Sequence, residues 1–362
     1  MYYKKTIYII DPVCPKFYDL ETLEKEGMGA SESYLLYNTI GLCKSKDVKN
    51  YQFLFFQDTR EEIKDYKYDT NNIKFIPLRD LINYEDLDPE SVILQRDPRL
   101  LTYLYRIYPK CNLILYNHDF YEGGNLQHLT NENITTILET GVKFVCVSKW
   151  HVNNIKENLI LRNINIKNID YNYFYFDDED LGELCCKTQK RDPYKLCFFS
   201  GHHKGLAKTL TIFKKLREID SKFKLVIGSP SYSTFEIENL ENSGIELKYN
   251  LPREKVLEEM NTSLCLLHPN DEYPETFGCV NMEANMLGIP VLCYPYGATK
   301  EILTDERQFI NPNPNLYDPQ DLRECINKIL SWNKFPIEIN TLNKKVNKSN
   351  ILRKWMRLLK IT

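Results

Sequence analysis

Residues 264–303 read LCLLHPNDEYPETFGCVNMEANMLGIPVLCYPYGATKEIL, and they predict a strand, a loop, a helix and a second strand. The short, nearly continuous apolar runs LCLLHP and PVLCYP are typical of parallel strands that are buried on both faces. The helix between them is expected to open near Thr276 and to end at Gly288, because Pro290 follows. The stretch therefore predicts a βαβ unit of an α/β domain.

Two glutamates bracket the predicted helix. Glu275 lies at its mouth and Glu283 follows eight positions later, which is about 12 Å along an α-helix. That length is close to the span between the sugar hydroxyls and the ribose hydroxyls of a nucleotide-sugar. The helix N-terminus between them offers unpaired N–H groups and a positive dipole end, which suit a diphosphate. Taken alone, two glutamates at this spacing also describe a solvated helix face.

The run ETFGCVNME from Glu275 to Glu283, with GIPV after it, resembles the E-x7-E region of retaining glycosyltransferases of family 4. These enzymes have the GT-B architecture. The resemblance implies that Glu275 binds hydroxyls of the donor sugar and that Glu283 binds the ribose. It also implies that the diphosphate rests on the backbone N–H groups of Thr276, Phe277 and Gly278. The family usually has a glycine where this chain has Ala298.

The composition is that of a soluble globular protein with room for two domains. The 362 residues are 43% hydrophobic and 27% charged, and the net charge of −3 gives no reason to expect a nucleic-acid partner. No apolar run approaches the roughly 20 residues of a membrane helix, and the N-terminus moves straight into a strand without the apolar core of a signal peptide. The 11 cysteines include no CxxC pair and fit a reducing compartment. We therefore expect a cytoplasmic protein.

Strands and helices alternate along the chain, which predicts an α/β fold of two doubly wound Rossmann-like domains facing a cleft. Residues 1–170 are expected to form the N-terminal, acceptor-side domain. Residues 171–345 are expected to form the C-terminal domain, which binds the nucleotide-sugar. The amphipathic tail, about 349–362, is expected to pack back on the first domain, as the family's C-terminal helix commonly does. The basic residues of this tail are also compatible with a peripheral contact to a membrane surface.

The run SGHHKG, residues 200–205, follows a predicted strand and precedes a predicted helix. The resemblance implies that Gly201 and Lys204 bind the donor here. A lysine at this place neutralises the charge that builds on the diphosphate as the glycosidic bond breaks. The family also has an arginine before this lysine, and this chain has His202 and His203 instead. That departure predicts a weaker or pH-dependent clamp, or a different loop shape. Without the resemblance, a lone lysine after a strand is usually solvated.

Two features of the N-terminal half add to the predicted site. The run GMGASES begins about sixteen residues after the first strand and has Glu32 where a dinucleotide fingerprint needs its third glycine, which disfavours NAD or FAD. It resembles the family's glycine-rich loop, in which Gly29 lets the backbone approach the donor phosphate or the acceptor closely. His118 ends a predicted strand, and the family often has a histidine here that contacts the transferred sugar. Without the resemblance, the run GMGASES reads as an ordinary flexible turn before a helix, and His118 reads as a structural histidine.

Two Asp-x-Asp triplets, 86–88 and 178–180, raise the question of a metal. A glycosyltransferase of the other common architecture holds a divalent cation on such a pair. Neither triplet follows an apolar strand directly, and no cysteines and histidines stand at zinc spacing. We therefore expect no metal and no cofactor, with a UDP-, GDP- or ADP-sugar as the substrate.

With the resemblance, the sequence predicts a metal-independent hexosyltransferase. It is expected to move a hexose from a nucleotide diphosphate-sugar to an acceptor hydroxyl, with retention at the anomeric carbon. The acceptor can be a glycan, a lipid or a protein. The expected catalytic residues are His118, Lys204 and Glu275. The alternatives are a nucleotide-sugar epimerase or phosphorylase of GT-B fold, and a non-catalytic relative that binds the sugar nucleotide.

Overall fold

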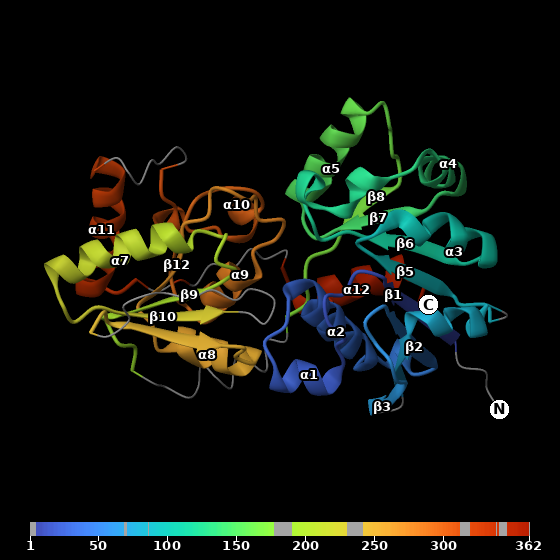
Figure 1. The fold of residues 1–362 in the computed structure, drawn as a ribbon, viewed down its shortest axis with the longest axis horizontal. Helices are drawn as coiled ribbons and strands as arrows, with labels where there is room; N and C mark the ends of the chain where they lie inside the picture. The colour runs from blue at the N-terminus through green and yellow to red at the C-terminus, as the bar shows by residue number, and fades with distance from the viewer. Residues whose placement is uncertain are drawn as a thin grey trace. The chain divides into compact units, whose positions relative to one another are not determined.

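A computed structural model describes residues 5–68, 71–85, 87–176, 190–229, 242–311, 319–337, 339 and 346–361. Contacts divide the chain into two compact units. Unit 1 comprises Met1–Leu20, Ser31–Phe176 and Lys345–Thr362, and unit 2 comprises Glu21–Ala30 and Asp177–Lys344. Figure 1 shows that each unit is a sheet covered by helices.

Unit 1 is built on an eight-stranded sheet in the order β3-β4-β2-β1-β5-β6-β7-β8. The strands are β1 (Lys5–Asp11), β2 (Tyr51–Gln57), β3 (Lys64–Tyr68), β4 (Asn71–Pro77), β5 (Ser91–Gln95), β6 (Asn112–Tyr116), β7 (Lys143–Cys146) and β8 (Ile169–Tyr171). All neighbours pair in parallel except β3 with β4, which are antiparallel. Without the edge strands β3 and β8, the chain order across the sheet is 3-2-1-4-5-6, the order of doubly wound dinucleotide-binding folds.

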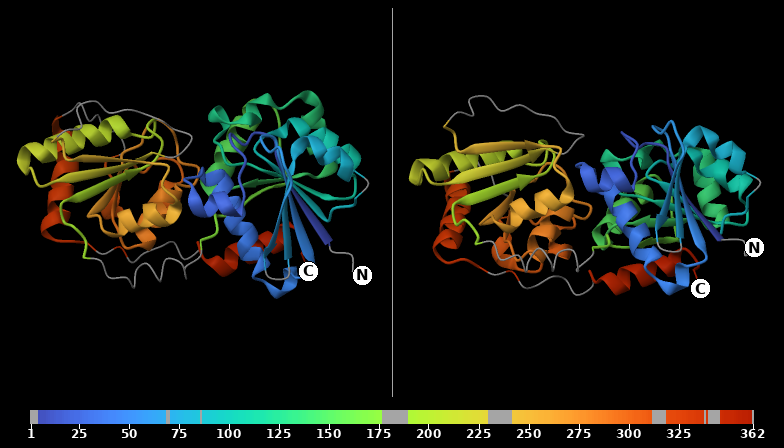
Figure 2. Two further views of the ribbon diagram at one scale, coloured as in Figure 1. Left: turned by 60° about the horizontal axis from the view of Figure 1, so that its bottom comes forward. Right: turned by 90° about the horizontal axis from the view of Figure 1, so that it is seen from below.

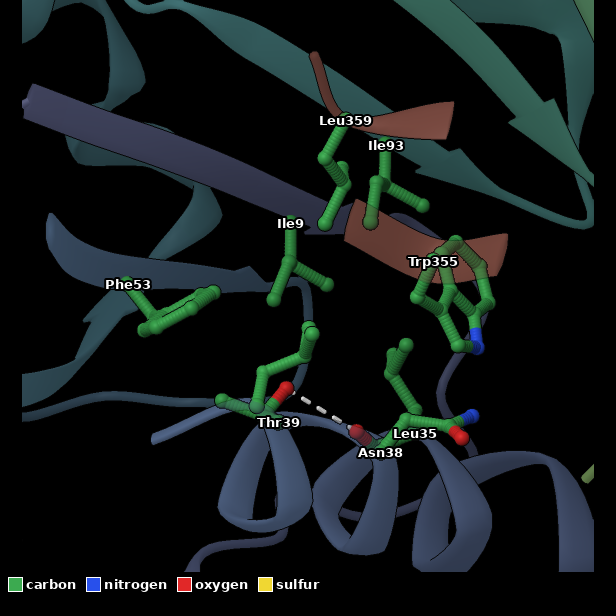
Figure 3. A pocket seen from close by; sticks show the side chains of 9 residues that line it. Ile9, Leu35, Asn38, Thr39, Phe53, Ile93, Trp355 and Leu359 are labelled. Carbon is green, nitrogen blue, oxygen red and sulfur yellow. Dashed lines mark hydrogen bonds between the residues drawn. The ribbon is translucent and has the colours of Figure 1, made fainter. Parts of the chain in front are cut away.

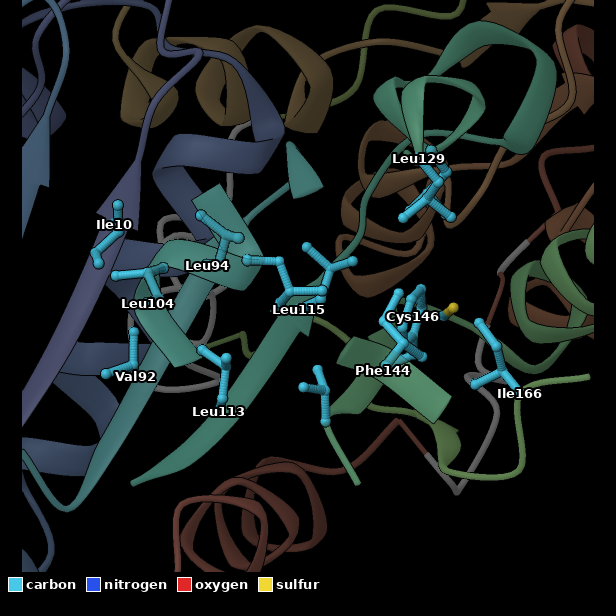
Figure 4. Packing of buried hydrophobic residues seen from close by; sticks show 14 of the residues in the cluster. Ile10, Val92, Leu94, Leu104, Leu113, Leu115, Leu129, Phe144, Cys146 and Ile166 are labelled. Carbon is cyan, nitrogen blue, oxygen red and sulfur yellow. The ribbon is translucent and has the colours of Figure 1, made fainter. Parts of the chain in front are cut away.

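Helices and apolar side chains complete this unit. Its helices in the N-terminal half are α2 (Ala30–Cys43), α3 (Leu101–Ile107), α4 (Asn131–Thr140) and α5 (Lys149–Leu161), with short 3-10 turns η1 (Lys46–Val48), η2 (Leu78–Tyr84), η3 (Pro98–Leu100), η4 (Tyr121–Gly123) and η5 (Asn125–His128). The short helix α1 (Leu20–Lys25) falls in the segment that belongs to unit 2. Alternate strand residues fill the core that Figure 4 shows, among them Ile10, Val92, Leu94, Leu113 and Leu115. This alternation follows from the two-residue period of a strand.

The C-terminal helix α12 (Lys348–Leu358) belongs to unit 1. Its residue Trp355 is 1% exposed and lies with Leu359 beside Ile9 and Ile93 of the sheet (Figure 3). The chain after the helix is also bound to the sheet, because Ser91 Oγ donates to the carbonyl of Leu359 at 2.8 Å. Among the described residues, no helix is long and apolar enough to cross a membrane.

Unit 2 is built on a five-stranded sheet in the order β11-β10-β9-β12-β13, and every pair is parallel. The strands are β9 (Lys195–Phe199), β10 (Lys224–Ser229), β11 (Ile245–Tyr249), β12 (Cys265–His268) and β13 (Val291–Cys293). The chain order is 3-2-1-4-5, so the direction of winding reverses between β9 and β12. Ligands of open α/β sheets bind at the carboxyl ends of the strands beside such a reversal.

The helices of unit 2 are α7 (Leu206–Ile219), α8 (Arg253–Asn261), α9 (Cys279–Met286), α10 (Thr299–Ile302) and α11 (Pro319–Lys334), with the 3-10 turn η6 (Glu306–Gln308). Helices α7 and α11 share one core with the strands, in which Phe213 and Trp332 are buried with Phe198. Figures 1 and 2 show α7 over one face of the sheet and α8 over the other. The predicted α/β class with parallel sheets is confirmed. The prediction missed α1 and the antiparallel edge strand β3.

Candidate functional site

The loops that follow β9 and β12 come together at the reversal point of unit 2. The first carries Lys204, and the second runs from Pro269 to the start of α9. Gly205 makes this approach possible: its φ is +90°, and a Cβ at this residue would lie 2.6 Å from the carbonyl oxygen of Pro269. Only glycine tolerates both the left-handed backbone and the close contact. The glycine of SGHHKG therefore fixes how near Lys204 comes to the second loop.

Glu275 is the centre of the polar contacts at this point. Its Oε1 accepts a hydrogen bond from Lys204 Nζ at 2.9 Å and one from Asn270 Nδ2 at 3.3 Å. His268 Nε2 lies 3.6 Å from the same oxygen. The other carboxylate oxygen, Oε2, accepts no hydrogen bond from any described residue. The protein therefore holds one side of the carboxylate and leaves the other available.

The charge state of Glu275 follows from these contacts. The residue is 8% exposed, and burial alone would raise the pKa of its carboxyl group. The attraction of Lys204 and the hydrogen bonds from Lys204 and Asn270 outweigh burial and lower the pKa below its ordinary value. Glu275 is therefore an anion at neutral pH.

The backbone of Glu275 is fixed by the turn that follows β13. Glu275 and Gly297 form an isolated parallel bridge, and Ala298 N donates to the carbonyl of Glu275 at 2.7 Å. Gly297 has φ +66°, and a Cβ on it would lie 2.4 Å from that carbonyl oxygen. The position of Glu275 thus depends on two chain segments that are far apart in sequence.

The helix after Glu275 starts later than the sequence predicts. Helix α9 begins at Cys279 rather than near Thr276, because Gly278 takes φ +88° as its N-cap. Glu275 therefore precedes the helix, and the helical spacing of about 12 Å between the two glutamates does not apply. The first N–H groups of the helix, which have no acceptor within it, are those of Cys279, Val280 and Asn281. Gly278 supplies no side-chain cap.

Glu283 is held by a residue that the sequence did not single out. Arg253, the first residue of α8, donates from Nε to Glu283 Oε1 at 2.7 Å. Their side chains are 18% and 9% exposed, so the pair is largely shielded from water. No signal in the sequence near either residue predicts the contact, since it joins two helices that are 30 positions apart.

The loops after β9 and β12 carry four other predicted donor residues, which are Gly201, Thr276, Phe277 and Gly278. Thr276 is half-buried, while Phe277 and Gly278 are buried. The carbonyl of Gly201 accepts from Lys204 N at 2.9 Å, and the ring of His203 lies against Gly201. Gly29, which was also predicted to bind the donor, directly precedes α2 and is half-buried. The structure thus brings Lys204 into direct contact with Glu275, while Glu283 is held separately by Arg253.

His118 belongs to unit 1 and follows β6. It is 6% exposed, packs against the ring of Tyr116 with centroids 4.2 Å apart, and has no hydrogen-bond partner at either ring nitrogen among the described residues. Burial, with the nearby charge of Arg96, lowers the pKa of His118 well below its ordinary value. The ring is therefore neutral at pH 7, with two nitrogens available for hydrogen bonds.

A charged cluster that sequence reasoning missed lies at the carboxyl end of the same sheet. Arg96 follows β5 with φ +60°, which is rare for a residue other than glycine. It pairs with Asp119 through Nε at 2.9 Å and Nη2 at 3.3 Å, and with Glu32 through Nη1 at 3.5 Å. Burial, and then the charge of Glu32, raises the pKa of Asp11 at the end of β1 to about 7. Polar residues directly after apolar strands were the signal that could have found this cluster.

Within the described ranges, no group of three or more His, Cys, Asp or Glu side chains could hold a metal ion. The triplet 178–180 and Asp86 lie outside those ranges.

Comparisons with known proteins agree with this architecture. The family model described as glycosyl transferases group 1 matches residues 187–346. The chain has a TM-score of 0.69 to the pneumococcal O-GlcNAc transferase GtfA solved with UDP and GlcNAc, at 13% identity over 99% of each chain. For an α,α-trehalose-phosphate synthase (UDP-forming) from Burkholderia vietnamiensis the TM-score is 0.57, at 9% identity over 98% of this chain and 96% of the other. No curated protein matches the sequence.

At such identities the structural likeness establishes the fold alone. The expected GT-B architecture of two Rossmann-like domains is confirmed. The matched range 187–346 contains the described contacts of Lys204, Glu275 and Glu283. The chain thus has the GT-B fold, and most of its second unit is similar to the glycosyl transferases of group 1.

Proposed function

We propose that this chain is a retaining glycosyltransferase that moves a hexose from a nucleoside diphosphate-sugar to an acceptor hydroxyl. One observation carries the proposal. At the reversal point of the unit 2 sheet, Lys204 and Glu275 are 2.9 Å apart, and Glu275 Oε2 has no partner among the described residues. A cation and an available carboxylate oxygen at this place suit the diphosphate and the sugar of one donor.

Each proposed donor contact has a physical reason. Glu275 Oε2 accepts hydrogen bonds from sugar hydroxyls, while Oε1 remains held by the protein. Glu283, oriented by Arg253, accepts from the ribose hydroxyls. Lys204 and the first N–H groups of α9 bind the diphosphate, because a helix N-terminus favours negative charge. Gly29, Gly201 and the residues Thr276, Phe277 and Gly278 shape the backbone around the donor.

The reaction places its largest charge change on the leaving group. The bond between the anomeric carbon and the diphosphate breaks with its electron pair on the phosphate oxygen. The acceptor oxygen bonds to that carbon and passes its proton to the departing phosphate oxygen. Lys204 stabilises the developing negative charge. We keep His118 as the proposed contribution of unit 1 to catalysis, where its neutral ring can bind a hydroxyl of the transferred sugar. No residue of the proposal needs a metal.

The test begins with binding. UDP, GDP, ADP and their hexose conjugates are screened by thermal shift, since a ligand of the folded state alone raises the melting temperature. UDP is the first choice because GtfA was solved with UDP and the trehalose-phosphate synthase is UDP-forming. The product formed with an acceptor library is then analysed for its anomeric configuration. A retained α-glycoside from an α-linked donor supports the proposal, and no shift with any nucleotide contradicts it.

The same experiment separates the alternatives. A C2-epimerised sugar indicates an epimerase, and a free sugar phosphate indicates a phosphorylase. Donor binding with no turnover on any acceptor indicates a binding protein without catalysis.

A further inference from the structure

Glu275 has a second nitrogen neighbour that the proposed mechanism does not use. His268 ends β12, is 2% exposed, and places Nε2 3.6 Å from Glu275 Oε1. This is just beyond the range of an N–H···O hydrogen bond. Nε2 also has no hydrogen-bond partner among the described residues. Buried polar atoms are rarely left unpaired, so the orphan nitrogen needs an explanation.

The cation that now holds Glu275 is also the one that the donor needs. Lys204 is 31% exposed at its side chain, whereas the Glu275 side chain is 10% exposed. A diphosphate therefore competes with Glu275 for the same ammonium group. If Lys204 turned to the phosphate and nothing replaced it, Glu275 would be a buried anion held only by Asn270, which is strongly unfavourable.

We infer that His268 replaces Lys204 at Glu275 when the donor binds, by donating a hydrogen bond from Nε2–H to Oε1. The inference rests on the proposed function. Lys204 is then released to the diphosphate, and Glu275 keeps its charge and its orientation toward the sugar. A closure of about half an ångström brings the 3.6 Å separation into hydrogen-bond range. His268 is thus a positioning residue that acts through Glu275.

The surroundings of His268 favour a neutral donor rather than a charged one. The groups facing it are Glu275 and Lys204 from the two loops and Asn281 from α9. Burial, with the charge of Lys204, lowers the pKa of His268 to about 4 against the opposing effect of Glu275. A neutral imidazole carries one N–H, and only the tautomer protonated at Nε2 can donate to Glu275. Asn281, which is 1% exposed, borders the same ring and, like Glu275, opposes the lowering of its pKa.

The test replaces the ring by side chains that keep or lose one donor. His268→Gln places an amide near the position of Nε2, whereas His268→Asn reaches only as far as Nδ1 and His268→Leu has no donor. The probe is whichever of UDP, GDP and ADP gives the largest thermal shift, and its Kd is measured by calorimetry. We expect His268→Leu and His268→Asn to weaken binding of the diphosphate roughly ten- to a hundredfold, the range of a hydrogen bond to a charged group. His268→Gln should restore most of the affinity.

Two controls distinguish the exchange from a general loss of structure. The matching nucleoside, which has no phosphate to draw Lys204 away, should bind all variants as it binds the wild type. In a Lys204→Met background, His268→Leu should cause no further loss of diphosphate affinity, because there is no lysine for His268 to replace at Glu275.

The outcomes are separable from those of the proposed function. If a diphosphate binds the wild type and His268→Leu binds it equally well, this inference is wrong and the donor site stands. If His268→Leu loses the same affinity for the nucleoside as for the diphosphate, the inference is likewise wrong. If none of the three diphosphates binds the wild type, the proposed function fails and the inference fails with it.

Discussion

Arg253 Nε donates to Glu283 Oε1 at 2.7 Å, which joins the first turn of α8 to the middle of α9. A cation on one helix thereby orients a carboxylate on another at a place where neither side chain is well exposed. A carboxylate fixed in this way can select a pair of ribose hydroxyls without first losing conformational freedom. The pair is therefore where we expect nucleotide affinity to be most sensitive.

Removing the carboxylate of Glu283 should weaken binding of the nucleotide itself. We expect Glu283→Ala to raise the Kd of the nucleoside diphosphate roughly ten- to a hundredfold, because two hydroxyls lose a charged acceptor. Calorimetry measures the change. Glu254→Ala, an acid in the first turn of α8, is the control and should bind as the wild type does. Unchanged affinity in Glu283→Ala would remove this residue from the site.

Changing Glu275 should affect turnover more than nucleotide affinity. Glu275→Gln keeps the size of the side chain but removes the charge that pairs with Lys204. We expect kcat to fall by about 100-fold, while the Kd of the nucleotide without its sugar changes little. Glu272→Gln, in the same loop and exposed, provides the control. A kcat equal to that of wild type would place the transferred sugar elsewhere.

Neutralising Lys204 should act through the phosphates. We expect Lys204→Met to lower kcat/KM by about 100-fold or more, because the charge of the leaving group is no longer stabilised. Lys208, which lies in the first turn of α7 and pairs with Asp271, offers a matched lysine, and Lys208→Met should retain activity. Similar losses in the two variants would point to a general effect of positive charge.

The turn at Gly297 should be sensitive to a single methyl group. Gly297→Ala combines a left-handed backbone with a Cβ 2.4 Å from the Glu275 carbonyl oxygen, so we expect a loss of about 2 kcal/mol or more in the free energy of unfolding. Gly288→Ala is the matched control: its φ is +71°, and its nearest neighbour is the flexible end of Arg191. Thermal unfolding compares the two. An equal loss in both would mean that backbone strain, not the contact with Glu275, sets the cost.

The buried Asp11 predicts a pH-dependent stability. Because burial raises its folded-state pKa from 3.8 to about 7, the folded protein binds more protons than the unfolded chain between these values. The contribution of Asp11 to stability is therefore largest below pH 4 and is lost as the pH rises toward 7. We expect Asp11→Asn to gain stability relative to wild type between pH 5 and pH 8. A difference in melting temperature that stays constant over this range would contradict the assignment.

The sequence predicted the elements whose patterns are local. The strands around residues 264–303 follow from apolar runs, and the two α/β domains follow from the alternation of strands and helices. The start of α9 could not be predicted, because Gly278 stops the helix by taking φ +88° and glycine is also common inside loops.

Contacts between segments that are distant in sequence also could not be predicted. The pairing of Glu283 with Arg253 and the placement of His268 beside Glu275 depend on how helices and loops pack around the sheet. The position of Arg96 directly after an apolar strand was a local signal, but its pairs with Glu32 and Asp119 join segments that follow different strands and could not be predicted. No local pattern records such contacts.

The return of α12 to unit 1 bears on how the chain is made. Asn112 Nδ2 donates to the carbonyl of Leu358 at 2.8 Å, and Trp355 fills space beside Ile9. Protein synthesis proceeds from the N-terminus, so unit 1, whose eight strands are all made by Tyr171, lacks its last helix until Leu358 has been made. Unit 2 has all the strands of its sheet well before that point. It can therefore fold while unit 1 still lacks α12.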